Sequence, residues 1–479
     1  MADVQWGIRH VTPADNLATE INNAQQYGQK TVYLEAGDFQ LSYTAWMTIK
    51  TDNFTLRGAG AGSTIIHVSP KYTYEQTRDW ALIVQPDASQ GKTQIERVRL
   101  ADFTLQMDST LTGGNTDRRI GILLKDCREF TVERVWVRGY LDNTQNFPFE
   151  NGFQVYSSGA DALPSGGIAF DHCGCTQCLY GVYLGGTLGE IQSENLQRCS
   201  FINPAFRGKK TAEGQATGGS ASSLIDSVKN FNTLGVQPNY IIHNYTDAAY
   251  GRVHKVDETD PHKLVLKAPG WVGGRTNICQ SGDAYMVAAP EGDGIHIDNA
   301  KGTLVLGGAI AIFTNGVYIG PTVEDVKYTR LSQVIGPKFD DVDLGVYIGG
   351  DGTDQTQVIA ITRANEGGHI SDNGEDSLIV DHQLFRIPVE AQVYGLLNAS
   401  TPRDLEEEHP RAGTITRFGS GAGTTTYLIN QAFGNTSQNP LPDGFVGIYY
   451  DSIATEQKYY LVSWINSLGV WKKVELTSQ

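Results

Sequence analysis

The sequence is poor in cysteine, in positive charge and in long apolar segments. Only 6 cysteines occur in 479 residues, and their spacing does not suggest a disulfide scaffold, so we expect reduced thiols in a protein made in a cytosol. Lys and Arg number 37 against 53 Asp and Glu, a net charge of −16, which disfavours partnership with nucleic acid or with a membrane surface. No apolar run approaches the ~18 residues of a membrane span, and no secretory signal is recognisable.

Helical patterning is scarce as well. The sequence predicts one amphipathic helix, over 12–27, with Thr12 as its N-cap, Pro13 in the first helical position and Asp15 completing a Thr-x-x-Asp box. Glycine is abundant by contrast, with 54 of 479 residues, against a usual frequency of ~7%. Because glycine is disfavoured in helices, this composition favours strands and tight turns.

A recurring Gly-apolar-x-apolar phrase is the most informative feature. Its copies recur about every 20–30 residues, which is the signature of a repeat architecture. Short strand-like segments and no helices lie between them, so we predict an all-β fold, a right-handed parallel β-helix in which stacked coils bury a continuous apolar column. We expect the glycine to let the chain turn sharply between faces. A β-sandwich with coincidental glycine turns is the alternative. The copies begin at Gly121, Gly152, Gly181, Gly294, Gly316 and Gly345, with a weaker one at Gly367.

The presence or absence of the glycine repeat divides the chain into five predicted parts. An N-terminal cap spans 1–30, and the β-helix spans 31–212 and 291–400. A β subdomain of antiparallel-looking strands is inserted at 213–290. Residues 401–479, which are rich in aromatic residues and strand-like, form a C-terminal β module for trimerisation or carbohydrate binding.

Several of these features together resemble pectate-lyase-like right-handed β-helices, and among them bacteriophage tailspike depolymerases. The resemblance is carried by the 12–27 helix leading into Thr31-Val32-Tyr33-Leu34-Glu35-Ala36-Gly37, by Leu56-Arg57-Gly58-Ala59-Gly60, and by the glycine-led coils. It implies a homotrimer that binds and cuts bacterial surface polysaccharide, whether capsule, exopolysaccharide or O-antigen. It further implies a place in the virion tail beside tail or baseplate proteins, assembly in the host cytoplasm and action outside the cell.

Aligning the copies by their glycine predicts which side chains share the outer surface. The second residue after the glycine points outward, because strand side chains alternate between faces. Asp298, four residues after Gly294, lies on the same face. The residue before the glycine forms a flanking column that includes Asp293 and Glu366, and alternation alone leaves its direction open. The outward column reads Leu123, Gln154, Tyr183, His296, Tyr318, Tyr347 and His369.

Aromatic rings beside carboxylates are what a sugar-binding enzyme needs. Tyrosine offers an apolar face and a polar tip, and carboxylates serve as general acid, base or nucleophile in glycoside hydrolysis. We therefore predict a hydrolase without metal or cofactor, with Asp293, Asp298 and Glu366 as catalytic candidates; a plain solvated β-helix face is the alternative. The predicted substrate-binding residues are His296, Tyr318, Tyr347, His369, Tyr183 and Gln154.

Two other functions stay open. A polysaccharide lyase or epimerase of a secreted bacterial type needs Arg or Lys to neutralise an acidic sugar, and Arg118-Arg119, Arg138, Arg207 and Lys209-Lys210 are available. A receptor-binding spike without catalysis needs only the sugar contacts. The phrase at 292–297 also resembles polygalacturonase-type hydrolases, but the Asp-Asp pair and the Arg-x-Lys of that family are not found at suitable positions.

The cysteines at 173–178 raise a further alternative, a zinc site. Only Cys175-x-x-Cys178 has the ligand spacing, and a structural zinc site usually needs a second pair. Buried thiols are therefore the preferred interpretation.

Overall fold

The computed structural model describes residues 3–5, 7–41, 47–68, 79–107, 119–139, 149–157, 165–185, 196–298, 300–320, 329–349, 353–359, 361–373, 377–380, 415–421, 446–451, 458–465 and 470–476. The chain separates into two compact units, residues 1–387 and 388–479.

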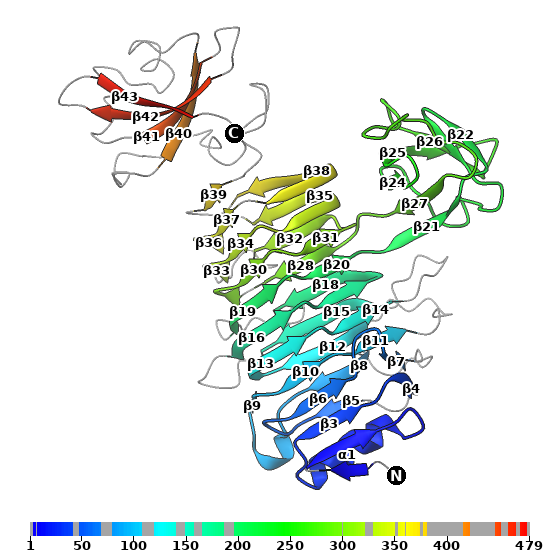
Figure 1. The fold of residues 1–479 in the computed structure, drawn as a ribbon, viewed down its shortest axis with the longest axis vertical. Helices are drawn as coiled ribbons and strands as arrows, with labels where there is room; N and C mark the ends of the chain where they lie inside the picture. Colours follow the sequence, from blue (N-terminus) through cyan, green and yellow to red (C-terminus); the bar gives the residue numbers. More distant parts are fainter. Residues whose placement is uncertain are drawn as a thin grey trace. The chain divides into compact units, whose positions relative to one another are not determined.

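The first unit is a parallel β-helix built from two sheets of 16 strands each (Figure 1). Strands of successive coils pair in parallel and in register, so the predicted fold is confirmed and the sandwich is excluded. Along its main path the first sheet contains β1 (Asp3–Gln5), β2 (Ile8–Val11), β3 (Thr31–Leu34), β6 (Thr55–Gly58), β10 (Arg99–Ala101), β13 (Cys127–Glu133), β16 (Ser165–Asp171), β19 (Leu196–Ile202), β30 (Leu304–Leu306), β34 (Gln333–Ile335), β37 (Gln357–Ile359) and β39 (Leu378–Val380).

The second sheet covers two faces of the coil. Its strand β35 (Lys338–Ile348) is 11 residues long and pairs with both halves. One half runs through β4 (Gly37–Leu41), β7 (Thr64–Val68), β11 (Thr104–Met107), β14 (Trp136–Arg138), β17 (Gly174–Thr176), β20 (Ala205–Arg207) and β31 (Ala309–Ala311). The other half, which carries the site, runs through β5 (Met47–Ile49), β8 (Asp79–Val84), β12 (Arg119–Lys125), β15 (Phe149–Tyr156), β18 (Cys178–Leu184), β28 (Asp293–Ile297) and β32 (Asn315–Ile319), and β38 (Thr362–Asp372) pairs with β35 at its end.

The core is a column of apolar side chains in the middle of the coils. The residue directly after each repeat glycine is fully buried, and these residues belong to one continuous cluster with the inward residues of the other faces. Each such side chain contributes about 1.5–3 kcal/mol of hydrophobic stabilisation when buried. The members from β12 to β35 are Ile122, Phe153, Val182, Ile295, Val317 and Val346.

The repeat glycines allow close packing between coils. None of Gly121, Gly152 and Gly294 has a positive φ, so the chain passes these positions without the left-handed backbone conformation that favours glycine. A Cβ on Gly294 would lie 2.6 Å from the Gly316 carbonyl oxygen and would also clash with Ile310. The glycine therefore faces inward, where the next coil leaves no room for a side chain.

The turn that leads from the first sheet to the next face repeats one backbone conformation. Asp102, Arg134, His172 and Asn203 stand at this corner in successive coils, with φ of 62°, 49°, 51° and 48°. Each donates its backbone N–H to the next coil, as Asp102 does to the Glu133 carbonyl at 3.0 Å. The corner thus continues the ladder of hydrogen bonds where the strands end.

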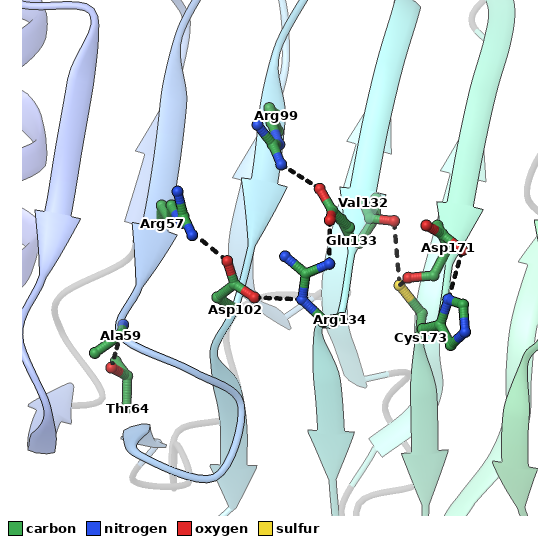
Figure 2. Close-up of polar contacts among 11 residues, drawn as sticks. Arg57, Ala59, Thr64, Arg99, Asp102, Val132, Glu133, Arg134, Asp171 and Cys173 are labelled. Carbon is green, nitrogen blue, oxygen red and sulfur yellow. Dashed lines mark hydrogen bonds and ion pairs between the residues drawn. The ribbon is translucent and has the colours of Figure 1, made fainter.

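Ion pairs link the corners of the early coils (Figure 2). The Asp102 carboxylate accepts from Arg57 Nε at 2.9 Å and from Arg134 Nε at 2.6 Å. Arg134 and Arg99 both bind Glu133 in turn. Burial by itself would raise the pKa of Asp102, but the hydrogen bond and charge of Arg134, together with Arg57, hold it below its ordinary value.

The N-terminal helix α1 (Leu17–Gln26) begins later than predicted. Asn16 is its N-cap and accepts from Thr19 N–H at 3.0 Å, so the assignment of Thr12 as N-cap was wrong. Thr12 and Asp15 do pair, but within the turn before the helix. Gln25 fixes the helix to β5 by donating to the Thr48 carbonyl at 2.7 Å. Among the described helices, none has the length and apolarity needed to cross a bilayer.

An antiparallel sheet of seven strands is inserted between β20 and β28, and its first strand begins at Lys210 rather than at 213. It has its own core around Phe231, Trp271 and Tyr285. The Arg252 guanidinium binds the Asp343 carboxylate of β35 at 2.7 Å, which holds the inserted sheet against the coils. Its strands are β21 (Lys210–Gln215), β22 (Gly218–Ser220), β23 (Ser223–Ile225), β24 (Ile241–Asn244), β25 (Ala249–Val256), β26 (Lys263–Leu266) and β27 (Ala284–Ala288).

The second unit contains a four-stranded sheet. β40 (Ile415–Gly421) pairs in parallel with β41 (Val446–Asp451), and β41, β42 (Lys458–Ile465) and β43 (Val470–Leu476) form an antiparallel meander. All four strands lie within the strand-like segment 401–479.

Candidate functional site

Four rings form a stack along the outer surface of the second sheet. In register, Tyr183 of β18 pairs with His296 of β28, then with Tyr318 of β32 and Tyr347 of β35. Their ring centroids are 4.5, 4.4 and 5.0 Å apart, and their planes differ by 7°, 3° and 15°. We call these four residues the ring ladder. Gln154 of β15 precedes it in the same column.

Stacking decides which part of each ring meets solvent. Both faces of His296 are covered, one by Tyr183 and one by Tyr318, and Tyr318 is likewise enclosed by His296 and Tyr347. A sugar therefore cannot stack on the two inner rings, contrary to the expectation from the sequence. Of the two inner rings, Tyr318 offers a ligand its hydroxyl rather than its face. The ring nitrogens of His296 are buried, and Nδ1 is held by Asp293.

The flanking column points outward as well, which settles the direction that the sequence left open. In three successive coils it meets the ring column three residues later: Asn151 donates to Gln154 at 3.0 Å, Tyr180 lies edge-on to Tyr183 at 5.5 Å, and Asp293 binds His296. The repeat glycine and its successor both face inward. Strict alternation is therefore broken, and the residues on either side share the outer surface.

Asp293 and His296 form a buried pair. The Asp293 carboxylate contacts His296 Nδ1 at 2.6 Å through one oxygen and accepts from Asn315 Nδ2 at 2.7 Å through the other. The two residues are only 5% and 6% exposed. An ionised carboxylate only accepts, so the hydrogen of the neutral imidazole is on Nδ1. Nε2 is then an acceptor, and it is buried without a hydrogen-bond partner.

Asp298 provides a second buried carboxylate next to the ladder. It is 5% exposed, and the Tyr183 hydroxyl donates to its Oδ2 at 3.4 Å. Its neighbours in the adjacent coils are Gly185 and Gly320, because Asp298 N–H donates to the Leu184 carbonyl and Gly320 N–H to the Ile297 carbonyl, both at 3.0 Å. Asp298 therefore lies between the backbones of the two adjacent coils, with the Tyr183 hydroxyl against its carboxylate.

Tyr318 keeps its proton over the whole neutral range. Burial, with contributions from Tyr347, Asp293, Asp298 and Tyr180, raises its pKa to about 12. Its hydroxyl is therefore available as a hydrogen-bond donor beside the two carboxylates.

His369 and Glu366 do not take the positions predicted for them. Tyr347 pairs with Ser371, and His369 pairs with Leu344. His369 therefore occupies the flanking column, where Glu366 was predicted, and Glu366 lies further back along β38. Aligning Gly367 with Gly345 was wrong because β38 gains and then loses one residue against β35 through two register shifts. Catalytic and binding roles for these two residues stay predictions.

The cysteine cluster lies in the core. Cys175 and Cys178 are fully buried, and burial raises the pKa of Cys178 and that of Cys173, to about 12. Among the described residues no group of three His, Cys, Asp or Glu side chains is placed to hold a metal ion. Arg207, one of the cations considered for a lyase, donates to the Tyr245 hydroxyl of the inserted sheet at 2.8 Å, while Arg118 lies outside the described residues.

The prediction omitted two neighbours of the site, Asn315 and Tyr180. Asn315 holds the second oxygen of Asp293, and the Tyr180 ring lies 5.5 Å from that of His296, edge-on. Both residues directly precede a repeat glycine and so belong to the flanking column, which the sequence identifies. They were not predicted as site residues because the sequence left the direction of that column open.

The comparisons with known proteins concern structure alone, since no protein-family model and no curated protein sequence matches the chain. A Geobacillus virus E2 protein, ORF18, is similar at 14% identity and a TM-score of 0.39, over 78% of this chain and 60% of that one. The Acinetobacter phage vb_AbaP_AS12 gp42 tailspike is similar at 11% identity and 0.38, over 99% of this chain and 82% of that one. A Paenibacillus alginate lyase is similar at 11% identity and 0.37, over 76% of this chain and 99% of that one.

The structures that the chain resembles thus include phage tailspikes and enzymes named for their action on polysaccharides. At these identities and TM-scores, they supply no argument about chemistry. The function proposed below depends on the site itself.

Proposed function

We propose that the protein binds and depolymerises bacterial surface polysaccharide by glycosidic hydrolysis. The observation that supports this most is the buried Asp293–His296 pair near a second buried carboxylate, Asp298, on the face that carries the ring ladder. Glycoside hydrolysis uses two proton-transferring groups on either side of the scissile bond. The ladder spans four coils, so its edges meet a polymer at repeated intervals of about 4.8 Å.

The proposal includes a homotrimer carried on a phage tail, with the inserted sheet and the C-terminal sheet as accessory modules. An apolar stripe supports association between copies. Ile202, Leu306, Ile335 and Ile359 are in register on the outer face of the first sheet, and Leu306 is 40% exposed. In the preceding coils the same column is charged, with Glu133 and Asp171. Parallel copies bring stripe against stripe and remove it from water.

A test of the function uses a panel of purified capsular polysaccharides and O-antigens. Incubation with the protein is expected to shorten one of them and to release reducing ends without ultraviolet-absorbing products. An unsaturated product would instead indicate a lyase, and binding without shortening a receptor-binding spike. Asp298→Asn is expected to lower the rate by about 10²–10⁴-fold, whereas Asp260→Asn, in a turn of the inserted sheet, serves as control.

A further inference from the structure

The Asp293–His296 pair contains an atom that the fold leaves unused. His296 Nε2 is buried and has no hydrogen-bond partner, although leaving such an atom unpaired inside a protein is costly. Every other feature of the ring is fixed: Asp293 holds Nδ1 at 2.6 Å, and Tyr183 and Tyr318 cover its two faces. The imidazole is therefore preorganised to accept a hydrogen bond or a proton, and Nε2 is the atom that accepts it.

Asp293 itself is poorly placed to exchange a proton with substrate. Both of its oxygens are engaged, one by His296 and the other by Asn315 at 2.7 Å, and the residue is 5% exposed. A carboxylate in this position fixes the tautomer of the ring and stabilises the imidazolium that forms when Nε2 accepts a proton.

We propose that His296 Nε2 is the proton acceptor of the reaction, and that Asp293 is a positioning residue acting through it. This inference depends on the proposed hydrolysis. A water molecule bound at Nε2 loses a proton to the imidazole while its oxygen forms a bond to the anomeric carbon. The glycosidic C–O bond breaks, and the leaving oxygen takes a proton from the Asp298 carboxyl. The imidazolium then returns a proton to Asp298 through solvent, so both groups are restored.

Several titratable groups surround the imidazole. They are Asp293 on its own strand, Asp298 just beyond it, Tyr180 and Tyr183 on β18, and Tyr318 on β32. As a base, His296 accepts the proton at Nε2 while Asp293 holds Nδ1.

His296→Phe tests the proposal, because it keeps an aromatic ring between Tyr183 and Tyr318 and removes only the nitrogens. The substrate is the polysaccharide of the panel that the wild type shortens. We expect kcat to fall at least 100-fold with KM little changed. The thermal midpoint is expected to fall as well, because the buried Asp293 carboxylate loses one partner and keeps only Asn315 of the two described above. His254→Phe, at an exposed position of the inserted sheet, is the matched control and is expected to keep wild-type activity.

Asp293→Asn provides a second measurement that does not depend on the Phe variant folding. Its amide donates to Nδ1 and moves the ring hydrogen to Nε2, so nitrogen NMR shifts of His296 should report the opposite tautomer, and kcat should fall because Nε2 no longer accepts a proton. A His296→Phe enzyme that keeps more than a tenth of wild-type kcat/KM overturns the proposal while hydrolysis stands. A wild type that binds polysaccharide without cutting it overturns the proposed function instead.

Discussion

The imidazole of His296 and the phenol ring of Tyr318 lie face to face, with centroids 4.4 Å apart and planes within 3° of each other. Because the two rings cover one another, what Tyr318 offers to a ligand is its hydroxyl. The stacked geometry therefore favours contact between a ligand and the Tyr318 hydroxyl over stacking of a ligand on the Tyr318 ring face.

Tyr318→Phe tests recognition through the edges. The variant keeps the stack and removes one donor, which is worth about 1 kcal/mol, so KM for the polysaccharide is expected to rise about fivefold without loss of stability. Steady-state kinetics and thermal unfolding measure the two effects. Tyr27→Phe, which changes a side chain that is 70% exposed on the cap, is the control. An unchanged KM in Tyr318→Phe would contradict edge recognition.

Gly294→Ala is expected to destabilise the β-helix. Its Cβ would lie 2.6 Å from the Gly316 carbonyl oxygen, and the backbone of the next coil cannot give way locally. Overpacking of this kind costs about 1–3 kcal/mol, which urea unfolding would detect. Gly62→Ala is the matched control, since nothing lies within 4 Å of its Cβ. Equal unfolding midpoints for both variants would refute the close-packing explanation.

Asp102→Asn is expected to lower stability at neutral pH but not in acid. The folded pKa of Asp102 is depressed below its ordinary value of 3.8, so its stabilisation is fully present above that value and is lost as the pH falls through the folded pKa. Asparagine also tolerates the corner conformation, and the expected loss at pH 7 is about 1–3 kcal/mol. The difference in unfolding free energy between the two proteins should stay constant from pH 7 to about pH 4 and should then shrink as the pH falls through the folded pKa.

For Asp102 the control is Glu129→Gln, a change in an exposed pair 3.7 Å from Arg97. It should change stability by no more than about 1 kcal/mol at any pH. A constant difference between Asp102→Asn and the wild type down to strong acid would show that charge is not the cause.

Leu306→Asp tests the apolar stripe. A charge at the centre of the stripe opposes its burial against a second copy, so sedimentation should show dissociation to smaller species with the fold intact by circular dichroism. Val228→Asp, at an 81% exposed position in the inserted sheet, should leave the assembly unchanged. If Leu306→Asp has the same mass as the wild type, the stripe is not the interface.

The sequence alone determined the coil and its register through the ring ladder. A glycine motif that recurs about every 20–30 residues outside the insertion favours one alignment of Tyr183, His296 and Tyr318, because each coil must keep its apolar residues inside. It also indicated the antiparallel strands of the insertion. It failed at β38, where two opposite register shifts leave no trace in composition and place His369 in the flanking column.

Only the tertiary structure decided how the site operates. The direction of the flanking column depends on glycine and its successor both facing inward, which follows from the space that the next coil leaves. That direction brings Asp293 to His296 and Asn315, and it leaves Nε2 as the atom without a partner. The distance between stacked rings likewise depends on neighbouring coils. The sequence identifies the outward tyrosines, but it does not say whether a ligand can reach their ring faces or only their hydroxyl groups. The chemistry of this surface results from contacts between coils that are distant in the chain.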